Sequence, residues 1–77
     1  MKYSVKVKHR RFLTAAEAKA LADFGIKAVL NNHVYQEYSA HQAYNVDLTS
    51  ELLNTMKKTF TCTVVDDHIN IFIGIQP

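Results

Sequence analysis

The sequence has few of the residues that build cross-links, phosphate-binding loops and membrane spans. Its single cysteine, Cys62, excludes an internal disulfide and a four-cysteine zinc site. Its two glycines, Gly25 and Gly74, are too few for a glycine-rich phosphate loop or a dinucleotide-binding fingerprint. No apolar run approaches the ~18 residues that span a bilayer, and no signal-peptide pattern follows Met1. Because small secreted domains usually carry disulfides, we expect a cytoplasmic protein with no cofactor and no membrane contact.

The chain is long enough for one domain only. Hydrophobic residues make up 48% of its 77 residues, which is typical of a globular protein and too many for a disordered one. A chain of this length hides only roughly 60% of its unfolded surface, so its core is marginal. Such domains often gain stability from a partner or a second copy. We expect residues 1–77 to form one small α+β domain, with a homodimer as one form of association.

Positive charge gathers at the N-terminal end of the chain. Residues 1–11 contain no acid and five bases, although the whole chain has a formal charge of only +2. The five bases are Lys2, Lys6, Lys8, Arg10 and Arg11. The lysines alternate with Tyr3, Val5 and Val7, which predicts a strand with one buried and one charged face. The charged face could follow the phosphates of a nucleic acid. Lysines also keep an edge strand from pairing with other chains, and we prefer this edge-strand interpretation.

Two helices are predicted from local signals. Thr14 and Glu17 have the spacing of a capping box, and a glycine follows at the expected end, so we expect a helix over about residues 15–24. The cap of a second helix is either Asp47 or Thr49. Its predicted buried stripe consists of Leu48, Leu52, Leu53 and Met56.

The last part of the chain predicts a β-hairpin whose register follows from its turn. With Asp66 and Asp67 as a two-residue loop, apolar residues of the two strands fall opposite one another. The residues on this face are Phe60, Cys62, Val64, Ile69, Ile71 and Ile73. The other face takes Thr61, Thr63, Val65, His68, Asn70 and Phe72. We expect the first face to lie in the core.

Residues 26–46 allow two interpretations. A short apolar run before a pair of asparagines suits a strand, whereas Leu30, Val34 and Tyr38, spaced by four, suit one face of a helix. That stripe stops there because the next position in the series is polar, so we expect extended structure for residues 34–38. The predicted whole is an α+β fold: an antiparallel sheet of three to four strands, two helices packed on one face, and a C-terminal β-hairpin.

The candidate chemical groups do not form a complete site. His33, Glu37 and His41 are spaced by four, but the two histidines would lie ~12 Å apart along a helix axis at 1.5 Å per residue. That separation is too large for one metal ion, so we expect no metal site. Cys62 is predicted to point into the core, where a thiol is inert. We therefore expect no catalytic residues and no enzyme.

The most unusual segment is residues 33–46. It holds three of the four tyrosines and two of the four histidines, and Glu37 is its only charged residue. Tyrosine is frequent at interfaces because it offers a large contact area and a hydrogen-bonding hydroxyl. A polar connector whose rings pack locally is the alternative. We expect Tyr38 to contribute most to a surface for a partner. The predicted partner-binding residues are Tyr35, Tyr38, His41 and Tyr44.

These features favour a small non-enzymatic binding protein, of the inhibitor or adaptor type, that docks onto a larger protein or macromolecular complex. Phage-encoded proteins that block host machinery are one example of this class. A small enzyme or metal protein has the least support. The alternative with more support is a nucleic-acid-binding module that uses Lys2, Lys6, Lys8, Arg10 and Arg11.

Overall fold

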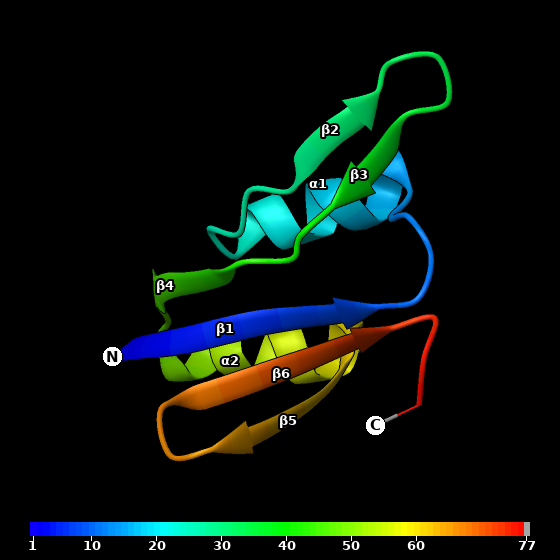
Figure 1. Ribbon diagram of the computed structural model, residues 1–77. Coiled ribbons are helices and arrows are strands. Elements are labelled where there is room, and N and C mark those ends of the chain that lie inside the picture. The colour runs from blue at the N-terminus through cyan, green and yellow to red at the C-terminus, as the bar shows by residue number, and fades with distance from the viewer. Residues whose placement is uncertain (77) are drawn as a thin grey trace.

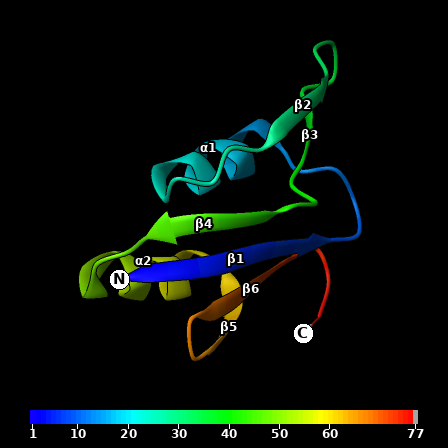
Figure 2. The ribbon, with the colours of Figure 1, turned by 60° about the vertical axis from the view of Figure 1, so that its left-hand side comes forward.

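The computed structural model describes residues 1–76, which form two helices and six strands in two sheets. A four-stranded sheet has the strand order β4-β1-β6-β5, and β2 and β3 form a separate two-stranded sheet. In Figure 1 α2 lies behind the larger sheet and α1 lies beyond its edge strand β4, next to the smaller sheet, and in neither Figure 1 nor Figure 2 does a helix cover the front face of the larger sheet. In chain order the elements are β1 (Lys2–His9), α1 (Ala15–Asp23), β2 (Val29–Asn32), β3 (Glu37–Ser39), β4 (Ala43–Asp47), α2 (Ser50–Thr59), β5 (Thr61–Val65) and β6 (His68–Ile73).

The predicted α+β fold with its C-terminal hairpin is confirmed, and the sheet differs from the expected one in two respects. β1 pairs antiparallel with β4 but parallel with β6, so the sheet is mixed rather than wholly antiparallel. β1 is also a central strand, with β4 and β5 at the edges, and the edge-strand interpretation of its lysines is wrong. Alternation of polar and apolar residues indicates only that one face is buried, and it is the same for central and edge strands of an open sheet.

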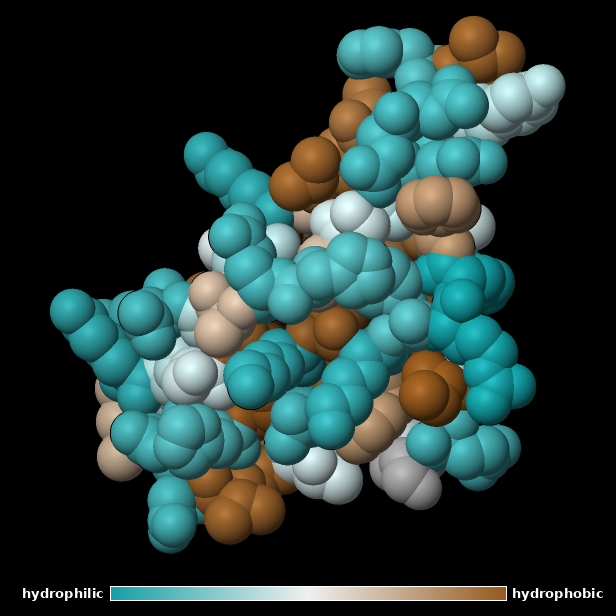
Figure 3. Space-filling view, viewed as in Figure 1, coloured by the Kyte–Doolittle hydropathy of each residue, from teal (hydrophilic) through white to brown (hydrophobic). Residues whose placement is uncertain are grey.

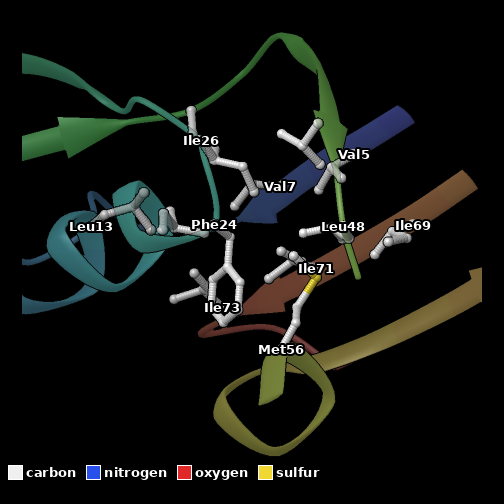
Figure 4. Packing of buried hydrophobic residues seen from close by; sticks show 13 residues of the cluster. Val5, Val7, Leu13, Phe24, Ile26, Leu48, Met56, Ile69, Ile71 and Ile73 are labelled. Carbon is white, nitrogen blue, oxygen red and sulfur yellow. The ribbon is translucent and has the colours of Figure 1, made fainter. Parts of the chain in front are cut away.

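The hydrophobic core lies between the sheet and the two helices. Figure 4 shows Met56 of α2 reaching toward Ile71 of β6, and Phe24, at the end of α1, lying beside Ile73. Met56 and Ile71 are fully buried. Because side chains alternate along β1 and β6, their polar residues are left on the opposite, open face. The buried cluster consists of Val5, Val7, Leu13, Leu21, Phe24, Ile26, Ala40, Val46, Leu48, Met56, Ile69, Ile71 and Ile73.

α1 begins and ends close to the positions that local signals predict. The Thr14 hydroxyl accepts a hydrogen bond from the Glu17 amide at 3.2 Å, and the Glu17 carboxylate accepts one from the Thr14 amide at 2.9 Å. After the last turn Gly25 adopts a φ of +85°, and the Ile26 amide donates to the Leu21 carbonyl at 3.0 Å. These contacts satisfy backbone groups at both helix ends and direct Ile26 into the core.

α2 is capped by Thr49, one of the two predicted caps. Its hydroxyl accepts a hydrogen bond from the Leu52 amide at 3.1 Å, whereas the Asp47 carboxylate accepts one from the N-terminal amino group at 2.7 Å. The predicted stripe is correct for the fully buried Met56 and wrong for Leu52, whose side chain is exposed. No helix of residues 1–76 combines the length and the apolar character needed to cross a membrane.

The C-terminal hairpin has the predicted register. Cys62 lies opposite Ile71, and Val64 lies opposite Ile69. Asp66 adopts a φ of +54° in the turn, a conformation that aspartate tolerates better than most residues. The isoleucines of β6 are buried, while Cys62 and Val64 are half-buried because β5 is an edge strand.

The chain between α1 and β4 contains a second hairpin, formed by β2 and β3, which we call the arm (residues 29–39). The extended structure predicted for residues 34–38 is wrong in its first half, because the chain turns there. The Asn32 side chain accepts hydrogen bonds from the amides of Val34 and Tyr35, at 2.9 and 3.4 Å. Such bonds from an asparagine to its following amides favour a turn over a continued strand.

Candidate docking surfaces

The arm projects from the body of the molecule (Figures 1 and 2) and is fixed at its base. Leu13, in the loop between β1 and α1, exchanges two backbone hydrogen bonds with Tyr38 of β3, at 2.8 and 3.2 Å. Within the arm, the Asn31 side-chain amide donates to the Ser39 hydroxyl at 2.8 Å. Tyr38 and three alanines of α1 line a hollow of about 330 Å³. The base is therefore anchored to the loop that precedes α1.

The tip of the arm exposes two large side chains on a hydrogen-bonded turn. Val34 is 82% exposed and Tyr35 is 72% exposed. The side-chain oxygen Oδ1 of Asn32 accepts hydrogen bonds from both of their amides, and Gln36 closes the turn with a φ of +49°. Hydrophobic atoms are visible at the upper end of the arm in Figure 3. Among residues 1–76 this is the only pair of chain neighbours in which both side chains are large, apolar and exposed.

The four predicted partner-binding residues are spread from the tip of the arm to the body of the molecule. Tyr35 lies at the tip, whereas Tyr38 and Tyr44 are half-buried against the core. The Tyr44 hydroxyl donates to the Lys27 carbonyl at 3.1 Å. His41 follows the arm and is exposed. Tyr35 is thus the accessible tyrosine of this set, and Tyr38, from which we expected the largest contribution, has much of its ring covered.

A histidine pair lies where the arm meets the end of β1. The rings of His9 and His41 stack with centroids 4.4 Å apart and planes 23° apart. The Ala40 amide donates to His9 Nε2 at 3.2 Å, so Nε2 must be the unprotonated nitrogen. His9 Nδ1 therefore carries the proton and donates it to the Arg11 carbonyl at 2.7 Å. These bonds join the end of β1 to the chain that leaves the arm, and they give His9 a structural role.

The open face of the larger sheet carries the β1 lysines at its centre. Lys6 lies beside Asn70 of β6, and Lys8 lies beside Phe72. The Lys8 ammonium is 5.9 Å from the centre of the Phe72 ring, within the range of a cation–π contact. The next strand, β5, places threonines beside Asn70 and Phe72. Figure 3 shows this face from the front, with hydrophilic side chains covering β1.

A concavity of about 570 Å³ adjoins this face where β1 and β6 end. It brings the Phe72 ring, the Arg10 side chain and hydrogen-bonding groups to one place. Gly74 adopts a φ of +69°, and a Cβ atom there would come within 3.1 Å of Arg11 Nε, so a larger residue would disturb this end of the sheet. The concavity is lined by Arg10, Thr61, Phe72, Gly74, Ile75 and Gln76.

The five predicted nucleic-acid-binding bases have different surroundings. Arg11 donates to both carboxylate oxygens of Glu17, at 2.9 and 3.0 Å. This hydrogen-bonded guanidinium is the main reason that the pKa of Glu17 falls to about 2. Lys2 lies beside Asp47, whose pKa is lowered chiefly by the N-terminal amino group and slightly by Lys2. In the part of the chain that the structure describes, four of these bases have no carboxylate within 4 Å: Lys2, which has Asp47 as its strand neighbour, and Lys6, Lys8 and Arg10.

The groups considered for metal binding and catalysis lie apart. His33 is in the turn of the arm, Glu37 begins β3, and His41 follows the arm. Within residues 1–76 no three histidine, cysteine, aspartate or glutamate side chains are placed to hold a metal ion. Cys62 is half-buried, and this burial raises the pKa of its thiol, which lowers its reactivity.

Two residues that matter for these surfaces, Val34 and Phe72, were not among the predicted site residues. The hairpin register already placed Phe72 on the face opposite the core, which was an available signal. For Val34 the signal was the preceding asparagine, which favours a turn at which an apolar residue becomes exposed. Comparison of the chain with protein-family models, with curated proteins and with solved structures gave no match.

Proposed function

We propose that the protein is a non-enzymatic binding protein, of the inhibitor or adaptor type, that docks the tip of its arm onto a protein partner. The observation that supports this most is the exposure of Val34 and Tyr35, 82% and 72%, on a turn that hydrogen bonds already hold in shape. Exposed apolar residues at the end of a projecting element contribute little to the stability of the fold. They stabilise a complex when another apolar surface covers them.

The charge of the arm favours a protein over a nucleic acid as its partner. Residues 29–39 contain no lysine or arginine, and their one acid is Glu37. A nucleic acid binds mainly through cations that contact its phosphates, and the arm offers none. A protein surface with an apolar pocket suits the Tyr35 ring, because aromatic side chains that fill such pockets carry much of the energy of protein interfaces.

The hydrogen bonds of the arm support this role as well. Binding is weakened when loops must become ordered at the interface. The Asn32 bonds at the tip and the Leu13–Tyr38 bonds at the base fix both ends of the arm before any partner arrives. The Cys62 thiol, which forms no disulfide, suits a reducing compartment, and we place this activity in the cytoplasm.

The experiment compares a double variant, Val34→Ser combined with Tyr35→Ser, with the single variant Val65→Ser and with the wild type. Val65 is 64% exposed but lies at the end of β5, on another side of the molecule from the arm. Each protein is immobilised, and captured proteins are quantified by mass spectrometry. We expect one partner to be retained by the wild type and Val65→Ser and lost by the double variant. With the purified partner, the double variant should raise Kd ~30-fold, as for the loss of a hot spot worth ~2 kcal/mol.

Two other outcomes decide the proposal. If the double variant retains every protein that the wild type retains, with unchanged Kd, the arm is not a docking element. Sedimentation velocity on the same three proteins tests a second copy as the partner. A dimer that forms with the wild type and Val65→Ser, and dissociates in the arm variant, identifies the partner as this chain itself.

A further inference from the structure

A second surface, separate from the arm, has the properties of a binding site for an anionic chain. Lys6 and Lys8 stand on the open face of a central strand, so protection of a sheet edge does not explain them. Arg10 continues this line past the end of β1 and lines the adjoining concavity. Among residues 1–76, none of these three bases has a carboxylate within 4 Å.

Three acids lie at the other end of this sheet, and Glu17, the acid near the basic end, is held by Arg11. Asp47 ends β4 beside Lys2, at the start of β1. Asp66 and Asp67 form the turn before β6, and the Asp67 carbonyl accepts a hydrogen bond from the Ser4 amide, also near the start of β1. At the start of β1 the N-terminal amino group and Lys2 lie beside Asp47 and offset part of this negative charge, whereas Lys6, Lys8 and Arg10 have no acid beside them. An anionic ligand is therefore attracted more to the Lys8–Arg10 end than to the opposite end.

The basic end also carries an aromatic ring, which makes the ligand more specific than a simple anion. Phe72 lies on the open face beside Lys8 and lines the concavity together with Arg10. Asn70 and the threonines of β5 surround it with hydrogen-bonding groups. Aromatic rings within a basic groove are the means by which proteins bind single strands, because any base can stack on them.

We propose that this face binds single-stranded nucleic acid, with a base against Phe72 and phosphates near Lys6, Lys8 and Arg10. The bases of a single strand are available for stacking, whereas those of a duplex are stacked on each other and are reached only by an element that enters a groove. The basic face is a sheet surface and has no such element. The arm is a two-stranded ribbon of suitable shape, but it contains no lysine or arginine.

The test is fluorescence anisotropy with labelled oligo(dT) and oligo(U) of about ten nucleotides, titrated at several salt concentrations. We expect binding that weakens with salt, with a log–log slope of about −2 for three phosphate contacts on a single strand. Lys6→Gln with Lys8→Gln should weaken binding and reduce the magnitude of the slope by about 1.4. Phe72→Leu keeps an apolar side chain and removes the aromatic ring, so it should weaken binding about tenfold and leave the slope unchanged.

The matched control is Lys57→Gln with Lys58→Gln. It removes the same charge from the exposed part of α2, behind the sheet, and should leave both affinity and slope close to those of the wild type. Equal losses in the two double variants would mean that only net charge matters and would overturn the proposal. It would also be overturned if a duplex of the same length bound as tightly as the single strand, or if no binding occurred at low salt.

This site and the arm are tested independently. Circular dichroism confirms that each variant is folded before its affinity is interpreted. The arm variant carrying Val34→Ser and Tyr35→Ser should bind the oligonucleotides like the wild type, because its changes lie outside the larger sheet. A loss of nucleic-acid binding in the arm variant would contradict the placement of the site on the open face.

Discussion

The two hairpins of this protein distribute their apolar residues in opposite ways. The β5–β6 hairpin buries Ile69, Ile71 and Ile73 along one strand and turns on the charged pair Asp66 and Asp67. The arm has exposed or half-buried apolar residues along its strands and places two of its most exposed ones at the turn. The first arrangement stabilises the chain by itself. The second gives its full stabilisation only when another surface covers the turn.

The difference between the hairpins also concerns what fixes their shape. The β5–β6 hairpin is held by a core that includes strands and helices from both halves of the chain. The arm depends on local bonds, the Asn32 turn at its tip and the Leu13–Tyr38 bridge at its base. Substitutions in the β5–β6 hairpin should therefore lower the stability of the fold, and substitutions at the tip of the arm should weaken partner binding.

The largest expected effect tests the buried hairpin. Ile71 is fully buried at the centre of the core, so Ile71→Ala should lower the free energy of unfolding by ~2–5 kcal/mol through lost contacts and a cavity. This is a large part of the stability of a small domain. Urea denaturation measures it. Leu30→Ala in the half-buried β2 strand is the matched change in the arm and should cost clearly less. Equal losses at the two positions would remove the distinction between the hairpins.

The next effect separates two tyrosines within the arm. The Tyr38 ring is half-buried against the core, and its backbone forms the bridge to Leu13. Tyr38→Ala should cost ~2 kcal/mol of stability, about half of the loss for a fully buried aromatic residue. Tyr35→Ala should change stability by less than about 0.5 kcal/mol, as at most exposed positions, and should impair partner binding. Thermal and urea unfolding of both variants measure this. A more destabilising change at Tyr35 would mean that the tip contributes to the fold.

A smaller effect concerns the loop that anchors the arm. Glu17 holds both Arg11 and the Thr14 amide, and its pKa falls from the ordinary 4.5 to about 2, mainly through the Arg11 hydrogen bond. Because the pKa is lower in the folded state, this contribution is complete above about pH 4.5 and is lost as the pH falls through 2. Arg11→Gln should therefore flatten the pH dependence of unfolding between these values, measured by urea denaturation. Lys19→Gln, which removes a base from the helix that contains Glu17, should leave this pH dependence as it is in the wild type. An unchanged pH dependence in Arg11→Gln would contradict the Arg11 hydrogen bond as the main cause of the lowered pKa.

The parts of the fold that the sequence predicted are those with local causes. Thr14 and Glu17 satisfy amides within one helical turn, and Asp66 with Asp67 set the register of the strands beside them. The position of β1 has no local cause. It depends on pairing with β6, more than sixty residues away in the chain. Alternation is the same for a central and an edge strand, so the pattern around Val5 did not predict which one it forms.

The surroundings of the predicted site residues could not be predicted from the sequence. Tyrosines were proposed for a partner surface and five bases for nucleic acid, but in the structure Arg11 is held by Glu17 and Tyr38 is packed on the core. Exposure depends on which neighbours the fold brings close, and a single sequence does not contain that information for side chains that contact distant residues. The C-terminal hairpin is the exception. Its turn fixed its faces, and thereby also the outward position of Phe72.

The smallest expected effect compares the turns of the two hairpins. Each turn has a residue other than glycine with a positive φ, +49° at Gln36 and +54° at Asp66. Side chains with a Cβ atom are disfavoured in this region, and aspartate tolerates it better than glutamine. Gln36→Gly should therefore stabilise the protein by ~0.5–1 kcal/mol, and Asp66→Gly by only a few tenths, since glycine also increases the entropy of the unfolded chain. Chemical denaturation measures both. A larger gain at Asp66 would mean that contacts of the Gln36 side chain offset its strain. Partner binding should not improve with Gln36→Gly, because greater freedom at the tip must be lost again when the arm docks.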